Sequence, residues 1–312
     1  MVATTRVGSP CRAAATTVIF ALLCDSATSL PGDDLYAVYE AKQQNKLLAA
    51  ANTTGHKFLK RIHEFDQSIE RILLQYLGRS KVAQHIAPYV LCVGARLGGE
   101  VRAFQAISNV KLAIGVDIAP GERNPLVMYG DAHELSQFKA ATFGCAYSNV
   151  LDHILHVDRF AKATWRVLTA GGSLMVDLPE QPLCKDIWAV HDLVVEHQLL
   201  VCQIESAGFE VVEHVREPYF WRKRLQGYMN RYIFRKVSAN AAGQKGCKAV
   251  LAQPPRHNMA RLIATIGNEP ARNQMFLGPS AQECSLLLPR TGLPRGLSGA
   301  ARQGEHPTRD SR

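Results

Sequence analysis

The sequence predicts an α/β fold, a three-layer sandwich in which helices cover both faces of a mostly parallel sheet. Short, continuous apolar runs recur along residues 89–177, and apolar stripes with helical spacing lie between and after them. Strands that are apolar on both faces are typical of parallel sheets buried beneath helices. The chain has 312 residues, of which 47% are hydrophobic, so it can bury a large core.

Five apolar runs are the predicted parallel strands. Each run ends at a glycine or a polar residue, where a buried strand gives way to a turn. In chain order the runs are Tyr89–Val93, Leu112–Val116, Leu126–Tyr129, Phe143–Tyr147 and Ser173–Val176.

Two later strand-like runs lie at Phe209–Val215 and Tyr228–Val237. The stretch between them, Glu217–Gly227, shows no clear helical stripe. We therefore expect the two runs to pair as an antiparallel hairpin. The hairpin completes a predicted sheet of seven strands.

Apolar residues recur at helical spacing in three segments. Leu35–Leu77 carries such a stripe and stops at Gly78, while Val157–Leu168 and Val190–Ile204 carry two more. Steps of three and four residues put these side chains on one face of a helix. The helix at Val157–Leu168 is expected to close at the Gly171-Gly172 pair, because glycine is a common helix stop.

Residues 1–30 have the composition of a targeting segment. Two arginines precede an apolar stretch at residues 13–24 and small residues follow it, the order of a secretory signal peptide. The stretch is too short for a transmembrane helix, which needs about 20 residues. An organellar transit peptide fits as well, and a disordered start with a cytoplasmic protein is the third alternative. Residues 31–88 are then a helical cap, and residues 89–237 form the main domain.

The last segment, residues 238–312, is basic and rich in proline and glycine. It holds ten Lys or Arg and four Asp or Glu, and so six of the nine net positive charges. Such segments are usually solvated and disordered, and we expect its removal to change stability little. Because the excess charge lies in the tail, it argues against nucleic acid as a partner of the main domain.

The eight cysteines suggest neither a metal site nor a disulfide framework. None forms a CxxC pair or a Cys/His cluster at zinc spacing. Cys92, Cys145 and Cys202 lie in apolar runs, where a free cysteine behaves as a small hydrophobe. We therefore expect reduced thiols in the core and no metal.

Polar residues follow the predicted strands where those strands end. Gly94, Asp117, Asp131 and the Ser148-Asn149 pair occupy four successive strand ends. In an open parallel sheet, ligands bind outside the carboxyl ends of the strands. A single glycine turn can serve packing alone, and a single Asp can merely cap a helix. Four such positions at successive strand ends, however, indicate a binding site.

Each of these residues has a chemical use. The turn that starts at Gly94 lets backbone approach a ligand closely. Asp117 lies about 20 residues beyond that turn, where an acid accepts bonds from ribose hydroxyls. Asp131 can accept a bond from an adenine amino group, and Ser148-Asn149 can close the floor. These types and this order predict a site for a nucleoside cofactor.

The stretch Val90–Asp177 resembles the class I S-adenosylmethionine-dependent methyltransferases, most closely their "type 11" small-molecule group. It covers about half of the chain, and the Arg-Val-Leu-Thr-Ala-Gly-Gly segment is its most specific match. The matching motifs, in order, are Val90–Gly98, Gly115–Asp117, Gly130–Ala132, Tyr147–His153 and Arg166–Gly172.

The resemblance implies a Rossmann-like domain that binds S-adenosylmethionine and methylates a small-molecule acceptor. Asp152 and His153, just past the fourth strand, are candidate bases for an acceptor that must lose a proton; helix capping and a satisfied core histidine are the structural alternatives. The implied cofactor-binding residues are Gly94, Ala95, Arg96, Gly98, Asp117, Ile118, Asp131, Ala132, Ser148 and Asn149.

Two positions depart from the family. Cys92 stands where the family usually has an acid, and Arg96 where it usually has glycine. Arg96 adds bulk beside the cofactor, although its charge could pair with the cofactor's carboxylate. A non-catalytic binding protein with the same fold therefore remains an alternative. An NAD-dependent oxidoreductase is a further alternative, but it needs GxGxxG and Arg96 replaces the second glycine.

Overall fold

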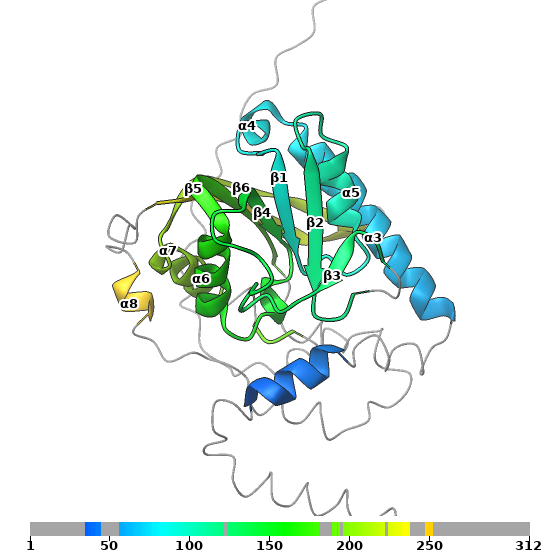
Figure 1. Cartoon of the computed structure of the whole chain (residues 1–312). Helices are drawn as coiled ribbons and strands as arrows, with labels where there is room; N and C mark the ends of the chain where they lie inside the picture. The colour runs from blue at the N-terminus through cyan, green and yellow to red at the C-terminus, as the bar shows by residue number, and fades with distance from the viewer. Residues whose placement is uncertain are drawn as a thin grey trace, which may run out of the picture.

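A seven-stranded sheet forms the centre of the computed structural model, in the order β3-β2-β1-β4-β5-β7-β6 (Figure 1). The structure describes residues 35–44, 56–120, 124–180, 189–191, 193, 196–221, 224–237 and 247–251. All neighbouring strands pair in parallel except at β7, which is antiparallel to β5 and to β6. The strands are β1 Tyr89–Val93, β2 Leu112–Asp117, β3 Val127–Tyr129, β4 Phe143–Ser148, β5 Leu168–Pro179, β6 Phe209–Trp221 and β7 Arg224–Lys236.

Helices cover both faces of this sheet, as the sequence predicts. α3 and α5 pack together on one face, while α6 and α7 lie together on the other (Figure 1). Residues 35–44 form a further helix beyond the carboxyl ends of the strands (Figure 1). The remaining elements are α3 His56–Leu77, α4 Ser80–Ala83, α5 Gly99–Gln105, the short 3-10 helix η1 Leu151–His153, α6 Val157–Val167, α7 His197–Ser206 and α8 Lys248–Leu251.

The sheet separates two apolar layers. Phe160 and Leu174 belong to the layer under α6 and α7, while Leu73 and Phe104 belong to the layer under α3 and α5. All four side chains are at most 1% exposed. Burying both faces requires strands that are apolar throughout, which explains the continuous runs in the sequence.

Polar contacts hold α3 against the start of α5. Asp66 Oδ1 accepts a hydrogen bond of 2.8 Å from the Gly99 amide. Arg102 pairs with Asp66 and, at 2.7 Å, with Glu70. A Cβ at Gly99 would lie 2.5 Å from the Asp66 carbonyl oxygen, so only glycine permits this approach. The predicted cap is thus anchored to the turn that follows β1.

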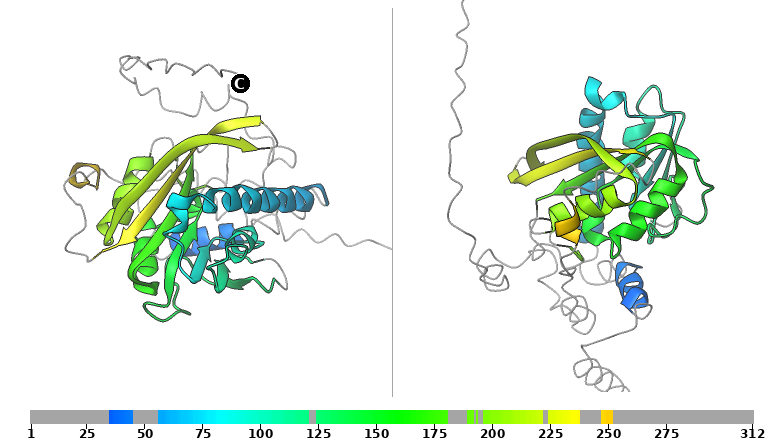
Figure 2. Two further views of the ribbon diagram at one scale, coloured as in Figure 1. Left: turned by 90° about the horizontal axis from the view of Figure 1, so that it is seen from above. Right: turned by 90° about the vertical axis from the view of Figure 1, so that its left-hand side faces the viewer.

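Two element boundaries differ from the prediction. α6 ends at Val167 and β5 begins at Leu168, so Gly171-Gly172 lie within the strand rather than after the helix. A Cβ at Gly172 would lie 3.1 Å from the Gly144 carbonyl oxygen, so this glycine serves close strand packing. The hairpin is also longer than expected, because the ends of β6 and β7 take up most of Glu217–Gly227 (Figure 2).

Other predictions fall partly outside the described residues. The expected helix at Leu35–Leu77 is seen as residues 35–44 and α3, with the stop at Gly78 confirmed. Residues 1–30 and most of 238–312 lie outside the described ranges. Within those ranges, no helix is long and apolar enough to span a membrane.

The prediction that the cysteines are reduced is wrong for one pair. Cys202 of α7 and Cys247 are joined by a disulfide, with their Cα atoms 5.3 Å apart. Cys92 and Cys145 are free and buried, as expected. Cys247 belongs to the segment that we expected to be independent of the domain, yet α8 packs on α7 (Figures 1 and 2). Part of the tail is therefore attached to the main domain.

Candidate functional site

The carboxyl ends of β1, β2, β3 and β4 meet at one edge of the sheet, and a small cavity of about 50 Å³ lies there. The structure thus brings together most of the predicted site. The lining includes Gly94, Arg96, Asp117, Ile118, Asp131 and Ala132, together with the candidate base His153. Ala95, Gly98, Ser148, Asn149 and Asp152 lie outside this lining.

The turn after β1 uses three left-handed residues. Gly94, Arg96 and Gly98 have φ values of 82°, 32° and 90°. A Cβ at Gly94 would lie 2.2 Å from Val150 Cγ2, so glycine is required there. Arg96 adopts a conformation that costs a non-glycine residue about 1–3 kcal/mol. The family's glycine at this position relieves strain as well as making room.

Asp117 lies at the end of β2 and is fixed by backbone amides. Its Oδ2 accepts a bond of 3.0 Å from the Arg96 amide, and its Oδ1 accepts one of 2.7 Å from the Ala119 amide. The side chain is largely buried. A carboxylate has about four acceptor positions, so two remain for hydroxyl donors. The two backbone amides give Asp117 a structural role, and its binding of ribose hydroxyls stays a prediction.

Asp131, just after β3, is held by His133 and by a tyrosine. Its Oδ1 lies 2.8 Å from both the His133 amide and His133 Nδ1, and its Oδ2 accepts a bond from the Tyr36 hydroxyl. His133 Nε2 accepts from the His156 amide at 3.2 Å, which leaves the ring proton on Nδ1. Burial raises the pKa of Asp131, but the bonds from His133 and Tyr36 outweigh it and lower the value to about 2. The carboxylate is therefore ionised at neutral pH.

Ser148 and Asn149 lie at the end of β4. Ser148 Oγ is fully buried and has no hydrogen-bond partner among the described residues. Asn149 Nδ2 donates to Glu100 Oε1 at 3.1 Å. Burial, with smaller effects from Asp66 and Asp117, raises the pKa of Glu100 to about 8. A buried acid thus lies beside the site, on α5, although Cys92 replaces the family's acid on β1.

The two candidate bases differ in their position. His153 lines the cavity, while the Asp152 backbone carbonyl accepts bonds from the amides of Val190 and His191 at 2.6 and 3.0 Å. His153 Nε2 lies 3.7 Å from Asp152 Oδ2. His153 is thus the candidate that lines the cavity, while Asp152 lies outside its lining and is not within hydrogen-bond distance of the His153 ring.

The helix at residues 35–44 contributes a wall of the cavity that we did not predict. Tyr39 and Gln43 line it, and the Tyr36 hydroxyl contacts both Asp131 and His133 Nδ1. The spacing of these residues, i, i+3 and i+7, places them on one helix face. That pattern is visible in the sequence, but nothing there indicates which surface the face covers. Val150 and Ile154 are further lining residues that we missed.

The residues at the strand ends fit an S-adenosylmethionine-like cofactor in chemistry. Asp117 lines the cavity and keeps acceptor positions that its two amide donors do not use. The cavity volume of about 50 Å³ is small, since drug-sized ligands occupy pockets of about 300–1,000 Å³. A nucleoside cofactor therefore needs more room than this conformation gives, and Tyr39 and Gln43 of the helix at residues 35–44 form part of the wall.

The strand order, the antiparallel β7 and the position of the site define the class I methyltransferase fold. No family model matches the chain, and no curated protein matches its sequence. Solved structures match part of the chain at low sequence identity and with TM-scores below 0.5.

Three of these structures illustrate the likeness. The 1,6-didemethyltoxoflavin-N1-methyltransferase of Burkholderia thailandensis, solved with S-adenosylhomocysteine, is 16% identical over 67% of this chain and 92% of its own, with a TM-score of 0.49. The YcgJ protein of Bacillus subtilis is 13% identical over 54% and 97%, with a TM-score of 0.39. An S-adenosylmethionine-dependent methyltransferase of Methanosarcina mazei is 14% identical over 51% and 98%, with a TM-score of 0.37.

Proposed function

We propose that this chain is an S-adenosylmethionine-dependent methyltransferase that acts on a small molecule. One observation carries the proposal: Asp117 and Asp131, from adjacent strand ends, line one cavity together with the left-handed turn at Gly94. Two acids at that separation in the chain suit the ribose and the base of a nucleoside cofactor.

When bound, S-adenosylmethionine supplies a methyl group attached to a positively charged sulfur. Asp117 accepts bonds from the ribose hydroxyls, and Asp131 accepts one from the base once Tyr36 has moved away. His153 faces the acceptor side and can take a proton from an acceptor that must lose one. The helix at residues 35–44 excludes water after it closes.

A non-catalytic binding protein with this fold is the second candidate. It is favoured by Arg96, whose left-handed φ of 32° and long side chain occupy the position of the family's glycine. It is also favoured by Tyr36, whose hydroxyl already occupies an acceptor position of Asp131. Such a protein binds the cofactor weakly or binds another ligand at the same edge.

Calorimetric titration separates these readings. The full-length protein is titrated with S-adenosylhomocysteine and separately with NAD. Saturable binding of the first, with no response to the second, supports the methyltransferase. Binding of NAD alone overturns it in favour of an oxidoreductase.

A labelling experiment then tests catalysis. The protein is incubated with S-adenosylmethionine carrying a labelled methyl group and a small-molecule extract. Label transferred by the wild type and lost in His153→Gln supports the role of His153 as a base. Cofactor binding without any transfer, across extracts, favours the non-catalytic candidate.

We further propose that residues 1–30 direct the chain to an oxidising compartment as a secretory signal peptide. The Cys202–Cys247 disulfide supports this reading, because disulfides persist mainly in such compartments. Locating a C-terminally tagged protein in its cells, and sequencing its mature N-terminus, tests the proposal. A cytosolic protein that keeps residues 1–30 contradicts it.

A further inference from the structure

The disulfide on α7 lies beside a glutamate carboxylate, and none of the three residues lines the strand-end cavity. Cys202 and Glu205 are three residues apart in α7, which places their side chains on neighbouring positions of one face. Cys247, which directly precedes α8, is joined to this face by the disulfide. The two sulfurs and a Glu205 carboxylate oxygen all lie within 4.8 Å of one another.

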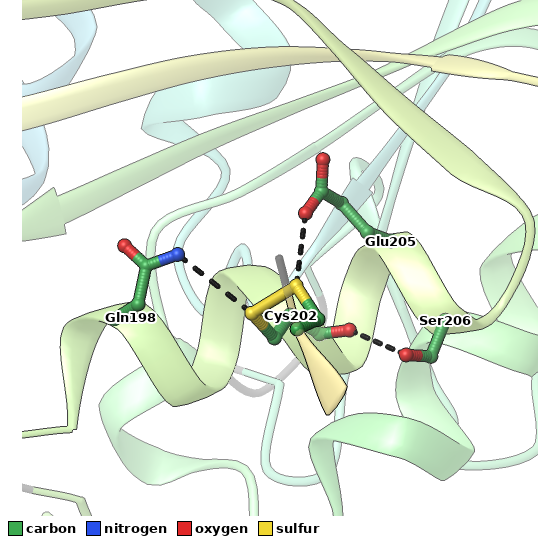
Figure 3. Close-up of a disulfide and its surroundings, with 5 residues drawn as sticks. Gln198, Cys202, Glu205 and Ser206 are labelled. Carbon is green, nitrogen blue, oxygen red and sulfur yellow. Dashed lines mark hydrogen bonds between the residues drawn. A yellow bond between two sulfur atoms is a disulfide. The ribbon is translucent and has the colours of Figure 1, made fainter. Parts of the chain in front are cut away.

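The contacts around the sulfurs suit a reduced pair, either as thiols or with a bound cation. Cys247 Sγ lies 3.3 Å from Glu205 Oε2, and the Gln198 amide nitrogen points at Cys202 Sγ from 3.7 Å (Figure 3). A disulfide sulfur has no hydrogen to donate to a carboxylate. A thiol can donate to it, and a cation can bridge a carboxylate and two thiolates.

We propose that reduction of the Cys202–Cys247 disulfide creates a zinc site made of Cys202, Cys247 and Glu205. A dithiol reductant transfers two electrons and two protons to the disulfide and is itself oxidised to a disulfide. Zn²⁺ then binds both sulfurs and displaces the two thiol protons to solvent. The Glu205 carboxylate supplies the third bond.

The ligand chemistry selects zinc among common divalent ions. Thiolates are soft ligands, and a set of two sulfurs with one carboxylate suits Zn²⁺ better than Mg²⁺ or Ca²⁺, which take oxygen ligands. Cys202 and Cys247 are 0% and 4% exposed, so the sulfurs are shielded from solvent. Gln198 donates toward one sulfur, as partners of metal-bound thiolates commonly do. Three protein ligands leave a fourth tetrahedral position for water.

Residues 247–251 stay attached to α7 both in the oxidised protein with its disulfide and in the reduced protein with zinc bound. The disulfide attaches them covalently, and the metal attaches them by coordination when the surroundings are reducing. The state of this position is then set by the redox conditions, while the docking of the segment is preserved. This inference does not depend on the proposed methyltransferase activity.

The test uses the full-length protein in both redox states. The protein is reduced with dithiothreitol, freed of reductant without oxygen, and titrated with Co²⁺ and then with Zn²⁺. We expect a thiolate-to-cobalt absorption band that Zn²⁺ abolishes, and no band in the oxidised protein. Equal binding by the oxidised protein overturns the proposal, as does the absence of the band after reduction.

Variants assign the ligands. Cys202→Ser and Cys247→Ser are each expected to weaken Zn²⁺ binding at least about a hundredfold, because one of few ligands is lost. Glu205→Gln keeps the disulfide, so its folding is checked in the oxidised state before reduction, and we expect weakening of about tenfold or more. Cys284→Ser removes a thiol from the same tail and serves as the matched control. An equal loss in Cys284→Ser, or none in Glu205→Gln, contradicts the assignment.

Discussion

Buried or half-buried acids occur in two parts of the sheet, and the groups that stabilise their charge differ. At the strand-end cavity, Asp117 and Asp131 accept hydrogen bonds from backbone amides, His133 and Tyr36. Under α3, Asp177 of β5 is paired with the Arg231 guanidinium at 2.7 Å and accepts a bond from the Tyr147 hydroxyl at 2.9 Å. The guanidinium charge of Arg231 therefore neutralises Asp177, whereas Asp117 and Asp131 have hydrogen-bond donors but no such cation in the described part of the chain.

The comparison separates structural from functional acids. Arg231 is 2% exposed and also pairs with Glu217 at 2.6 Å, so its cluster is closed and offers nothing to a ligand. Asp117 keeps acceptor positions that its two amide donors do not use, and Asp131 accepts a bond from Tyr36 on the helix at residues 35–44. A carboxylate whose hydrogen-bond donors are neutral or lie on a movable helix can exchange these donors for hydroxyl or amino groups of a ligand. Four changes test this contrast, taken here from the largest expected effect to the smallest.

Arg231→Met tests the closed cluster. It leaves the Asp177 carboxyl buried without its cation, and removal of one partner of a buried pair costs about 3–5 kcal/mol. We expect a large fall in the free energy of unfolding, measured by urea denaturation. Asp177→Asn in the same chain should restore most of it. A loss below about 1 kcal/mol contradicts a buried, closed pair.

Glu100→Gln tests the acid beside the cavity. The folded protein holds the pKa of Glu100 at about 8, above its ordinary 4.5, chiefly through burial. Below pH 4.5 the carboxyl is neutral in both states and costs nothing. As the pH rises toward 8 the unfolded chain ionises first, so stability is lost. Each pKa unit corresponds to about 1.4 kcal/mol, so the loss reaches a few kcal/mol.

The measurement is the free energy of unfolding from pH 4 to 9 in both proteins. We expect the wild type to lose stability over this range and Glu100→Gln to lose clearly less. Glu134→Gln, whose side chain is 55% exposed in the wild type, is the control and should follow the wild-type profile. Parallel profiles for all three proteins exclude a buried, protonated Glu100.

Asp117→Ala tests a cavity acid with two roles. Loss of the acceptors for ribose hydroxyls should weaken S-adenosylhomocysteine binding at least tenfold, since charge-assisted bonds contribute about 1.5–3 kcal/mol each. The structure adds a cost in stability, because the amides of Arg96 and Ala119 lose their acceptor. Asp117→Asn keeps one acceptor oxygen and is the milder control. Unchanged affinity, measured by calorimetry, removes Asp117 from the site.

The sequence predicts the sheet well because its strands are buried on both faces, which leaves an unmistakable apolar pattern. Parallel topology brings successive strand ends to one edge, and Gly94, Asp117 and Asp131 therefore line one cavity, whereas Ser148 and Asn149 lie outside its lining. The sequence misplaces the α6–β5 boundary, because the role of Gly172 depends on the approach of Gly144 from another strand. Local patterns carry no such information.

Two long-range pairings also escape sequence analysis. The Tyr36 hydroxyl reaches Asp131 across 95 residues, and the Cys202–Cys247 bond spans 45. The tyrosine lies in an ordinary helical stripe, and Cys247 in a segment whose composition suggests disorder. A cysteine pairing depends on the distance and direction of the two side chains, which one sequence does not reveal.

Tyr36→Phe is the smallest change and the sharpest test of the contrast between exchangeable and fixed partners. The substitution keeps the ring against His133 but removes the hydroxyl that donates to Asp131. If the helix at residues 35–44 must open for the cofactor, weakening the closed state raises the observed affinity by up to about tenfold. Calorimetry with S-adenosylhomocysteine measures this gain in affinity.

Tyr129→Phe, which removes an exposed hydrogen bond of 3.4 Å to Glu40 of the same helix, is the control and should change the affinity less. A fall in affinity for Tyr36→Phe would instead place the hydroxyl among the groups that bind the ligand, and the acid at β3 would then be held by a fixed partner, as Asp177 is.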